Sequence, residues 1–404
     1  MSSNALLSAA NRSNWQKEGK AHFQTGDAFF RTSSRTGRDL AVLAAIAYKS
    51  NHPRLRILDA MTGCGVRPLR YALEAKADYV WANEGNGELR SLIQTNLRAI
   101  APSRYKLTHQ DANAVFFDCY ARQDFYDLID IDSFSSPMPV LSTALWAVKI
   151  GGLLYLTSTD GRATSGRAPN KSLRSYSAYA RAHPAIHEQG LRLLLGTVMQ
   201  QAAAKGLCAE PVFSLYNGEV NRVMVRITRN SWRTEQYGFL AYCHDCGQFQ
   251  TVGWKSLGRV SCNCRLASLP IVSGPMWLGA LHSDRDLNDM RQLATERAKD
   301  SSFFEQSRNA WDNCVKLIDR MRAENNLPPY FYLLGEIGKR GKMDIPPSAV
   351  LMSRLRQQGF RATGTHIEPQ AIKTDAPFAA CLQIAKDIDL EIAHQLAQPP
   401  QPPE

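Results

Sequence analysis

The sequence predicts an α/β fold in which a Rossmann-like domain with a parallel sheet precedes a smaller α+β C-terminal domain. Strand and helix patterns alternate between residues 55 and 159, which is typical of a parallel sheet with helices on both faces. A loop with two glycines joins the first strand of this series to its helix. Two pairs of cysteines after residue 242 mark the beginning of a different module.

The length and the charge of the chain limit the classes of protein to which it can belong. The 404 residues are enough for two or three domains. Lysine and arginine number 48 against 37 aspartates and glutamates, a net charge of +11, which favours a polyanionic partner such as nucleic acid. No run of eighteen apolar residues and no secretion signal are found, so we expect no membrane association and a cytoplasmic location. In that compartment, clustered cysteines predict metal ligands rather than disulfides.

Arginines precede the first strand of the predicted sheet. Arg31, Arg35 and Arg38 lie ahead of an apolar helical run at residues 41–48. One interpretation is a solvated basic helix start. The other is that Arg38 binds the carboxylate of a cofactor as a bidentate donor.

The first strand leads into a ligand-binding type of loop. Residues 56–67 contain an apolar strand that ends at Asp59, a loop with Gly63 and Gly65, and the start of a helix that includes Arg67. The third glycine of the dinucleotide fingerprint is missing, and no phosphate-binding lysine follows, so S-adenosylmethionine fits better than a dinucleotide or ATP. The alternative is a purely structural turn.

Carboxylates follow the next two strands. Glu84 ends the strand at residues 79–84, at the position from which an acidic side chain binds a ribose diol. Asp111 follows the strand at residues 105–108 and would accept a hydrogen bond from an adenine amino group. Asp111 is also suited to cap the helix that begins at Ala112.

The strand at residues 126–132 contains the catalytic candidate. It carries Asp130 and Asp132, and a buried carboxylate is costly unless it has a partner or a task. Methyl transfer to an exocyclic base nitrogen needs a group that orients the amine and accepts a proton, and Asp132 meets this need. Phe134 would stack on the base. The alternative role of Asp132 is to cap the loop.

A basic segment that is expected to form a loop follows at residues 162–181. It interleaves Tyr176 and Tyr179 with positive side chains, which suits either a solvated loop or RNA contacts. The positive residues are Arg162, Arg167, Lys171, Arg174 and Arg181, with Arg192 in reach. A long helix is expected from His187, and strands at residues 210–217 and 221–228 are expected to form a hairpin.

The cysteine spacing predicts a structural zinc site. Cys243 and Cys246 are separated by two residues, Cys262 and Cys264 by one, and fifteen residues lie between the pairs. Four thiolates leave no open position for a substrate, so the metal would be structural. Because the second pair is unusually tight, His244 is an alternative ligand.

The C-terminal region predicts a winged-helix-like unit. Helices are expected at residues 331–339 and 348–359 and strands at residues 360–363 and 365–367. Its basic residues would form a nucleic-acid face or a solvated one; they are Lys339, Arg340, Lys342, Arg354 and Arg356. Residues 395–404 are rich in proline and glutamine and are predicted to be disordered.

Taken together, these motifs resemble those of the tRNA guanine-26 N2-dimethyltransferases over most of the chain. Residues 130–137 are similar to that family's Asp-Ile-Asp-Pro-Phe-Gly-Ser-Pro. The other matching segments are residues 29–30, 38–40, 59–67, 151–154, 159–160, 187–192, the cysteine pairs, 365–366 and 372–377. Ser133 and Ser135 replace the proline and the glycine of the motif, and Glu84 stands where aspartate is usual.

The resemblance implies a Rossmann-like class I methyltransferase domain and a C-terminal domain that binds tRNA. One or two methyl groups would pass from S-adenosyl-L-methionine to N2 of guanine, most naturally guanine 26. The expected boundaries are an N-terminal extension at 1–25, the methyltransferase domain at 26–235, the C-terminal domain with its zinc site at 236–394, and the tail.

The family's site residues transfer by motif. Asp132 would be catalytic, and the residues expected to bind the cofactor by this match are Arg38, Arg67, Glu84, Asp111 and Ala112. We assign Asp59, Gly63 and Asp130 to the same cofactor site. The alternatives are a methyltransferase for another tRNA or rRNA base, and an inactive RNA-binding protein on the same fold. No obligatory protein partner is evident.

Overall fold

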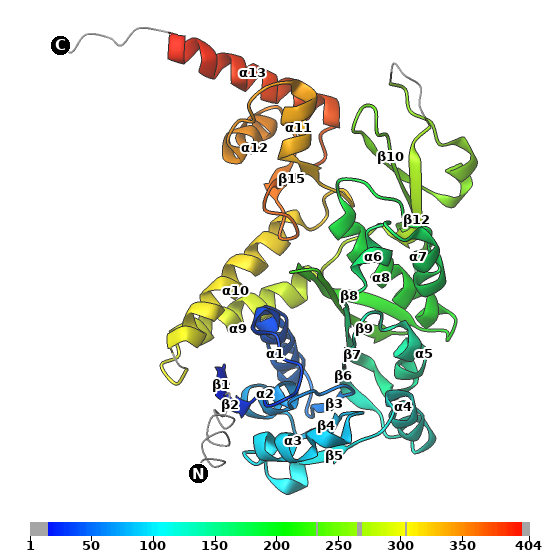
Figure 1. The fold of residues 1–404 in the computed structure, drawn as a ribbon, viewed down its shortest axis with the longest axis vertical. Helices are drawn as coiled ribbons and strands as arrows, with labels where there is room; N and C mark the ends of the chain where they lie inside the picture. The colour runs from blue at the N-terminus through cyan, green and yellow to red at the C-terminus, as the bar shows by residue number, and fades with distance from the viewer. Residues whose placement is uncertain (1–14, 232, 265–268, 304, 398–404) are drawn as a thin grey trace, which may run out of the picture. The chain divides into compact units, whose positions relative to one another are not determined.

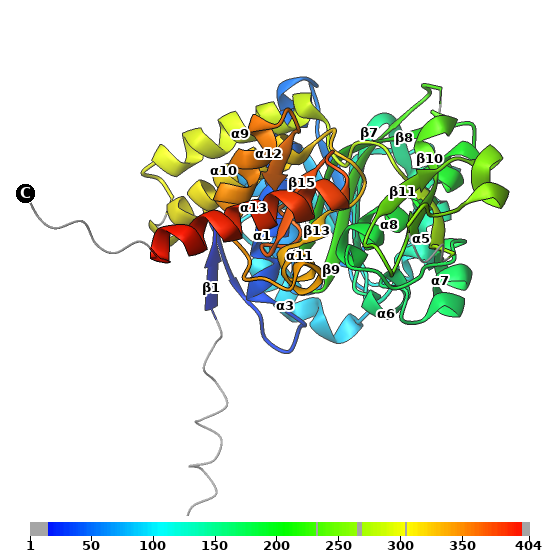
Figure 2. The same cartoon turned by 90° about the horizontal axis from the view of Figure 1, so that it is seen from above.

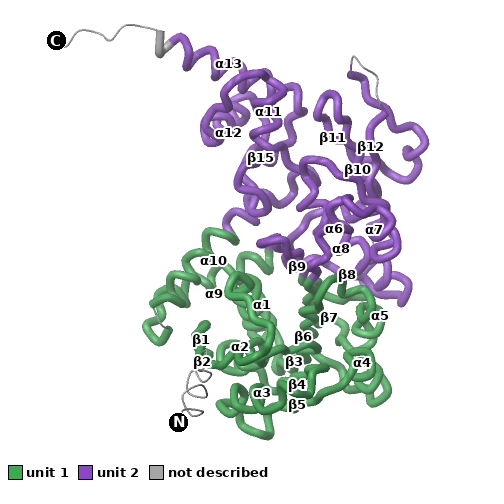
Figure 3. The backbone as a smooth tube through the Cα atoms, in the orientation of Figure 1, with its two compact units in different colours: residues 1–157, 224–229, 285–318 green, residues 158–223, 230–284, 319–404 purple. Residues whose placement is uncertain are grey.

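The computed structural model describes residues 15–231, 233–264, 269–303 and 305–397 (Figure 1; Figure 2 shows the same structure from above). The chain forms two compact units, each built from several segments (Figure 3). Residues 1–157, 224–229 and 285–318 make the first unit, and residues 158–223, 230–284 and 319–404 make the second. The functional domains expected at residues 26–235 and 236–394 remain predictions, since compactness is a different criterion from function.

A seven-stranded sheet is the main element of the fold, as the α/β prediction requires. Its order is β5-β4-β3-β6-β7-β9-β8. The pairs β3–β4, β4–β5, β3–β6 and β6–β7 are parallel. The strands are β3 (Arg56–Asp59), β4 (Tyr79–Asn83), β5 (Tyr105–Thr108), β6 (Tyr126–Asp132), β7 (Val148–Ser158), β8 (Cys208–Asn217) and β9 (Val220–Thr228).

Helices cover both faces of the sheet in the first unit. Figure 1 shows α1 (Arg35–Ser50), α2 (Val66–Glu74) and α3 (Arg90–Leu97) on one face, with α4 (Ala112–Ala121) and α5 (Met138–Ala147) on the other. Apolar residues of the central strands are fully buried between them, as at Leu58, Ile129 and Leu154. This is the layered arrangement that the alternation of strand and helix predicts.

An N-terminal hairpin joins the first unit through buried charges. It consists of β1 (Trp15–Glu18) and β2 (Ala21–Gln24). Residues 285–318, which include most of α9 (Asp284–Lys299) and α10 (Glu305–Glu324), also belong to this unit. A buried network of ion pairs connects the hairpin, α1, α2 and α9; its members are Glu18, Arg38, Asp39, Arg70, Glu74 and Arg297.

The segment predicted as a loop at residues 162–181 contains two helices. They are α6 (Gly161–Thr164) and α7 (Pro169–Tyr176) in the second unit. Pro169 is at the first position of α7. A backbone N–H at this position has no partner within the helix, so the N–H that proline lacks is not needed. The polar, basic composition of this segment therefore concealed short helices. The long helix α8 (Ile186–Ala203) follows, as expected.

Two small sheets complete the second unit. One has the order β11-β10-β12, formed by β10 (Tyr237–Tyr242), β11 (Phe249–Val252) and β12 (Ile271–Trp277). The other has the order β13-β15-β14, formed by β13 (Tyr332–Leu333), β14 (Ala362–Gly364) and β15 (Ala371–Thr374). Next to the second sheet, Figure 2 shows α11 (Leu334–Gly341), α12 (Ser348–Gln357) and α13 (Phe378–Ala397).

Two C-terminal predictions need correction. The strand expected at residues 365–367 is absent, because the backbone amide of His366 donates to the Glu324 carboxylate at 3.0 Å rather than to a strand. The predicted tail begins later than residue 395, since α13 continues to Ala397; residues 398–404 lie outside the described part of the chain. Within the described residues, no helix has the length and apolarity needed to span a membrane.

Candidate functional site

The acidic residues predicted for the site meet at one edge of the sheet. Asp59 ends β3 and Asp132 ends β6, while Glu84 follows β4 and Asp111 follows β5. Because these four strands are parallel, their carboxyl ends share one edge. Ligands of open α/β sheets bind in the crevice at this edge.

The loop between β3 and α2 depends on its two glycines. Gly63 and Gly65 have φ angles of +57° and +83°, in the left-handed region that favours glycine. The amide of Gly63 donates to Glu84 Oε2 at 2.8 Å, and Thr62 Oγ1 donates to Asp59 Oδ2 at 2.7 Å. Glu84 and Asp59 therefore fix the shape of the loop.

One arginine holds two of the three carboxylates of β6. The buried guanidinium of Arg67 lies 3.0 Å from Asp130 Oδ2 through Nη1 and 2.6 Å from Asp132 Oδ2 through Nη2. The side chain of Asp130 is fully buried, whereas that of Asp132 is 30% exposed. Asp132 is thus the carboxylate of this pair that a substrate can reach.

Tyr71 is a site residue that the sequence interpretation missed. Its hydroxyl donates to Asp130 Oδ2 at 2.6 Å. Tyr71 follows Arg67 by four positions, so both side chains lie on the same face of α2. The spacing of four residues between Arg67 and Tyr71 is the feature of the sequence from which Tyr71 could have been predicted.

Negative charge is in excess at this edge. Burial raises the pKa of Asp59 well above its ordinary value, and the neighbouring Asp130 raises it further. Burial also raises the pKa of Asp130, although Arg67 opposes this shift. Three carboxyl groups, including Asp132, gather around the Arg67 guanidinium. A positively charged ligand such as a sulfonium would stabilise their ionised forms.

Phe134, two residues after Asp132, meets a second exposed aromatic ring. The rings of Phe29 and Phe134 are 58% and 70% exposed, and they meet edge to face with centroids 4.9 Å apart. The Arg31 guanidinium lies 5.0 Å from the centre of the Phe29 ring. Exposed rings of this kind offer stacking surfaces for a base. The structure therefore brings Phe29 next to the predicted Phe134.

Arg38 and Asp111 have partners within the protein. Arg38 is buried and donates to both carboxylate oxygens of Glu18, at 2.8 and 2.5 Å. The Asp111 carboxylate accepts from the amide of Asn113 at 2.9 Å and caps α4, whose first residue is Ala112. Their contacts with a cofactor remain predictions.

Asn83 positions the edge and was not singled out from the sequence. Its side-chain amide donates to the carbonyl oxygens of Ala60 at 3.1 Å and Gln110 at 2.9 Å, and its Oδ1 accepts from the Gln110 amide at 3.1 Å. Asn83 is almost fully buried. It therefore ties the glycine loop to the segment that follows β5.

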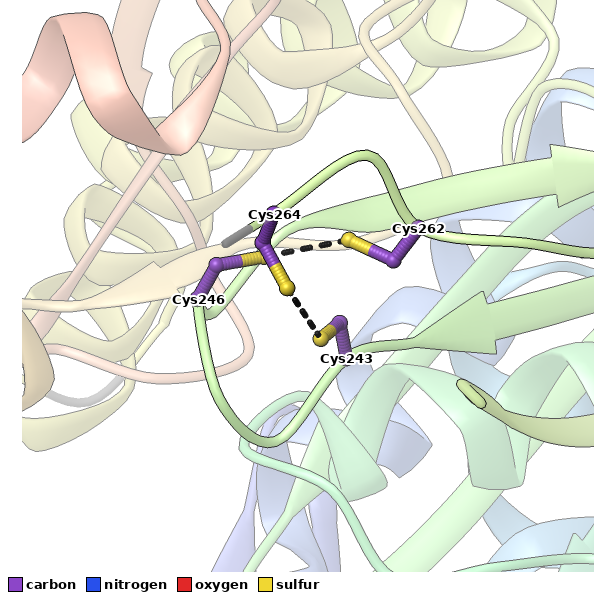
Figure 4. Close-up of side chains that lie close together, drawn as sticks. All are labelled: Cys243, Cys246, Cys262 and Cys264. Atoms are coloured by element: carbon purple, nitrogen blue, oxygen red, sulfur yellow. Dashed lines mark hydrogen bonds between the residues drawn. The ribbon is translucent and has the colours of Figure 1, made fainter. Parts of the chain in front are cut away.

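The four predicted cysteine ligands come together in the second unit. Figure 4 shows Cys243 facing Cys264 and Cys246 facing Cys262, with Sγ–Sγ distances of 3.8 and 3.4 Å. All four sulfurs lie within 4.8 Å of one another. Zn–S bonds of about 2.3 Å in a tetrahedron place sulfurs about 3.8 Å apart, so this donor set fits zinc. His244 is not a member of the group.

A second group, formed by His282, Glu324 and His366, also has ligand atoms within 4.8 Å of one another. The amide of Ser214 donates to His282 Nδ1 at 3.3 Å, so neutral His282 carries its proton on Nε2 and has no lone pair there. Lys373 Nζ lies 3.9 Å from Glu324 Oε2. These contacts favour a buried ionic network over a metal site.

Comparisons with known proteins agree with this geometry. A family model described as N2,N2-dimethylguanosine tRNA methyltransferase matches residues 10–386. The tRNA (guanine(26)-N(2))-dimethyltransferase of Pyrococcus abyssi is 29% identical, over 91% of this chain and 97% of the relative. That of Methanocaldococcus jannaschii is 28% identical, over 89% and 95%. The structure of Trm1 from Pyrococcus horikoshii with S-adenosyl-L-methionine is 26% identical, with a TM-score of 0.78 over 92% of this chain and 99% of that one.

Proposed function

The chain belongs to the family of N2,N2-dimethylguanosine tRNA methyltransferases, and we infer from this membership that it methylates the exocyclic N2 of guanine 26 in tRNA. S-adenosyl-L-methionine is the methyl donor, as in the similar Trm1 structure. The observation that carries the inference is the match to guanine-26 enzymes over nearly their whole length. It favours this target over another tRNA or rRNA base and over an inactive RNA-binding protein.

Asp132 would be the catalytic residue. Bound S-adenosyl-L-methionine supplies an electrophilic methyl group on a positively charged sulfur. The lone pair of the guanine amine is delocalised into the ring, so the amine needs help to become a nucleophile. Asp132 would accept a hydrogen bond from N2 and orient the amine. It would take up the proton released as the N–C bond forms and the bond between the methyl group and sulfur breaks, which leaves S-adenosylhomocysteine. Arg67 holds the carboxylate in place through Oδ2.

The remaining site residues would bind and orient the two substrates. Glu84 would accept hydrogen bonds from the ribose hydroxyls, and Asp111 and Ala112 would contact the adenine. Phe134, together with Phe29, would stack on guanine. The residues we further assign to the cofactor are Arg38, Asp59, Gly63, Arg67 and Asp130.

The four-cysteine cluster would hold a structural zinc ion in the second unit. The proposed macromolecular partner is tRNA. A substrate that is processed in the cytoplasm also implies a cytoplasmic location for the enzyme.

The test is methylation of an unmodified tRNA transcript with labelled S-adenosyl-L-methionine, followed by nucleoside analysis and mapping of the label. We expect N2-methylguanosine or N2,N2-dimethylguanosine at position 26 and no label when guanine 26 is replaced by adenine. Label at another position would contradict the proposed target. No label, with the cofactor still bound, would contradict the proposed activity on tRNA.

A further inference from the structure

We propose that residues 161–182 of the second unit form a surface that binds tRNA phosphates; this proposal rests on the proposed function. The segment contains no aspartate or glutamate. Its positive residues are Arg162, Arg167, Lys171, Arg174 and Arg181. A segment with positive charge and no acidic residue of its own attracts a polyanion over a distance of about a Debye length.

The arginines of this surface are available to a ligand. All four are exposed. Among the residues that the structure describes, none forms a hydrogen bond or an ion pair with the guanidinium group of Arg162, Arg167, Arg174 or Arg181. The contacts of Ser165 with Arg162 and of Ser273 with Arg181 involve backbone atoms of the arginines. Only Lys171 is paired, with Asp160 at 2.8 Å. Free guanidinium groups are suited to bidentate binding of phosphate oxygens.

The expected sixth cation does not belong to this surface. Arg192 is 2% exposed, donates to the Glu188 carboxylate at 2.8 Å, and donates to the carbonyl oxygen of Gly279, also at 2.8 Å. It is a structural residue of α8. The surface therefore consists of residues 161–182 alone.

The segment is held in a compact shape. Gly166 packs so closely on the backbone of Arg181 that a Cβ atom at position 166 would lie 2.4 Å from the Arg181 carbonyl carbon. This contact brings Arg167 and Arg181 near each other although they are fourteen positions apart. Tyr179 exchanges backbone hydrogen bonds of 2.8 and 3.1 Å with Gly274. A preformed arrangement of cations loses less entropy on binding.

Side chains between the arginines also suit RNA. Tyr179 is 40% exposed and Leu173 is 51% exposed. An exposed tyrosine ring among arginines can stack on an unpaired base or pack on a ribose. Tyr176, by contrast, is buried, and its hydroxyl shares a hydrogen bond with Ser158. Its role in this segment is therefore structural.

The second basic cluster, on α11 and α12, is a weaker candidate because its arginines are occupied. Arg340 binds Glu336 and the carbonyl oxygen of Asp245. Arg354 pairs with Glu391 at 2.6 Å. Arg356 is similarly engaged by a backbone carbonyl oxygen. These guanidinium groups would have to break internal contacts before they could bind phosphate.

The experiment compares two matched double variants of the full chain. Arg167→Gln with Arg174→Gln removes two charges from the proposed surface, and Lys339→Gln with Lys342→Gln removes two exposed charges from the α11 region. Binding of an unmodified tRNA transcript is measured across a series of KCl concentrations. We expect the arginine variant to bind about tenfold more weakly at 150 mM KCl, with a slope of log K against log[KCl] that is smaller by about two.

Control measurements test whether the loss of tRNA binding is specific to the two arginines. The lysine variant should bind tRNA within about twofold of wild type, and thermal melting and S-adenosyl-L-methionine binding of both variants should match wild type. Arg167→Lys with Arg174→Lys keeps the charge and should keep the salt slope. Two results would contradict the proposed surface. One is an unchanged salt slope for Arg167→Gln with Arg174→Gln, and the other is an equal loss of tRNA affinity for Lys339→Gln with Lys342→Gln.

The outcome for this surface is separate from that for the activity. A wild-type chain that methylates guanine 26 while the arginine variant binds tRNA normally overturns only the surface. A wild-type chain that binds tRNA through these arginines but methylates another base overturns only the proposed target.

Discussion

Arg67 binds two carboxylates of β6, Asp130 and Asp132, which have different environments. Its contact with the fully buried Asp130 is reinforced by the Tyr71 hydroxyl, whereas its contact with Asp132 occurs where the carboxylate is partly open to solvent. A buried ion pair fixes geometry more reliably than it adds stability. Arg67 and Asp130 therefore act as a support, and Asp132 is the carboxylate of the two that we propose to meet the substrate.

Asp132→Asn should separate chemistry from binding. We expect turnover on a guanine-26 transcript to fall by about 10²- to 10⁴-fold, because asparagine cannot take up the amine proton. The dissociation constant for S-adenosyl-L-methionine, measured by calorimetry, should change by less than about threefold. Glu88→Gln, an equivalent change at an exposed carboxylate, should leave both quantities unchanged. An equal loss in turnover and affinity would assign Asp132 to cofactor binding.

Glu324 should make the protein less stable in acid. Burial alone would raise the pKa of Glu324, but His366 and Lys373 outweigh it and hold that pKa at about 2, against an ordinary 4.5. Because the folded-state pKa is depressed, the ionised carboxylate contributes stability above pH 4.5. This contribution, roughly 3 kcal/mol, is lost as the pH falls from 4.5 towards 2.

The measurement is the free energy of unfolding of wild type and Glu324→Gln in urea at several pH values. The difference between them should be large at pH 7 and should narrow below pH 4.5. Glu391→Gln breaks a surface pair, in which the glutamate is 51% exposed, and should cost less than about 1 kcal/mol at any pH. A pH-independent difference for Glu324→Gln would disprove the linkage.

At the scale of elements, the loop between β3 and α2 depends on backbone conformation as much as on side chains. Gly65 has a φ of +83°, and a Cβ atom there would lie 3.3 Å from Ile93 Cγ2. Gly65→Ala should therefore destabilise the protein by about 1–2 kcal/mol and weaken cofactor binding. Gly87→Ala, where a Cβ atom meets nothing within 4 Å, is the matched control. Urea unfolding and calorimetry measure the two effects, and equal behaviour of both variants would contradict the prediction.

The β11-β10-β12 sheet should depend on metal. We expect one zinc ion per chain by elemental analysis, since four cysteine sulfurs gather next to β10. Removal of the zinc by a chelator, or Cys246→Ser, should increase amide hydrogen exchange in residues 237–277. Cofactor binding should persist, because the candidate cofactor residues lie in the first unit. Cys119→Ser, at a buried cysteine outside the cluster, should keep the zinc. A metal-free wild-type chain with full protection would exclude the zinc site.

Elements with a strong local pattern could be predicted from the sequence. The bounds of β5 and β6 are confirmed residue by residue, and the hairpin of β8 and β9 is confirmed as well. Both parallel strands are short stretches that interleave apolar residues with polar ones, as Tyr105-Lys106-Leu107-Thr108 does in β5. The helices α6 and α7 escaped prediction because they are short, polar and flanked by glycine and proline, so neither periodicity nor composition revealed them.

Pairs of residues distant in sequence could not be predicted. The candidate site residues were found one at a time, since each follows a strand or a glycine. The contact of Phe29 with Phe134 and the pairing of Glu18 with Arg38 join residues that no local pattern connects. The four cysteines are the exception, because metal binding imposes a recognisable spacing even on distant ligands.

At the scale of the whole molecule, the sequence suggested successive domains, but compactness divides the chain differently. Residues 285–318 return to the first unit after the chain has formed most of the second. Within the first unit, Arg297 from this returning segment pairs with Glu74 at 2.8 Å. The first unit is therefore complete only when distant parts of the chain are present.

The N-terminal hairpin supplies a counter-ion, which limits how far the enzyme can be shortened. Glu18 lies between Arg38 and Arg70, at 2.5 and 3.4 Å, with all three side chains buried. A fragment that begins at residue 26, the sequence-based boundary, would leave Arg38 without its carboxylate. Removal of one partner from a buried pair costs about 3–5 kcal/mol, so this fragment should unfold at a clearly lower urea concentration than the full chain.

A fragment that begins at residue 15 keeps β1 and β2 and should match the stability of the full chain. Equal stability of the fragments that begin at residues 15 and 26 would show that the hairpin is dispensable. The expected result is the opposite: the shortest stable form of this enzyme retains Glu18, and what the sequence suggested as an extension is an integral part of the first unit.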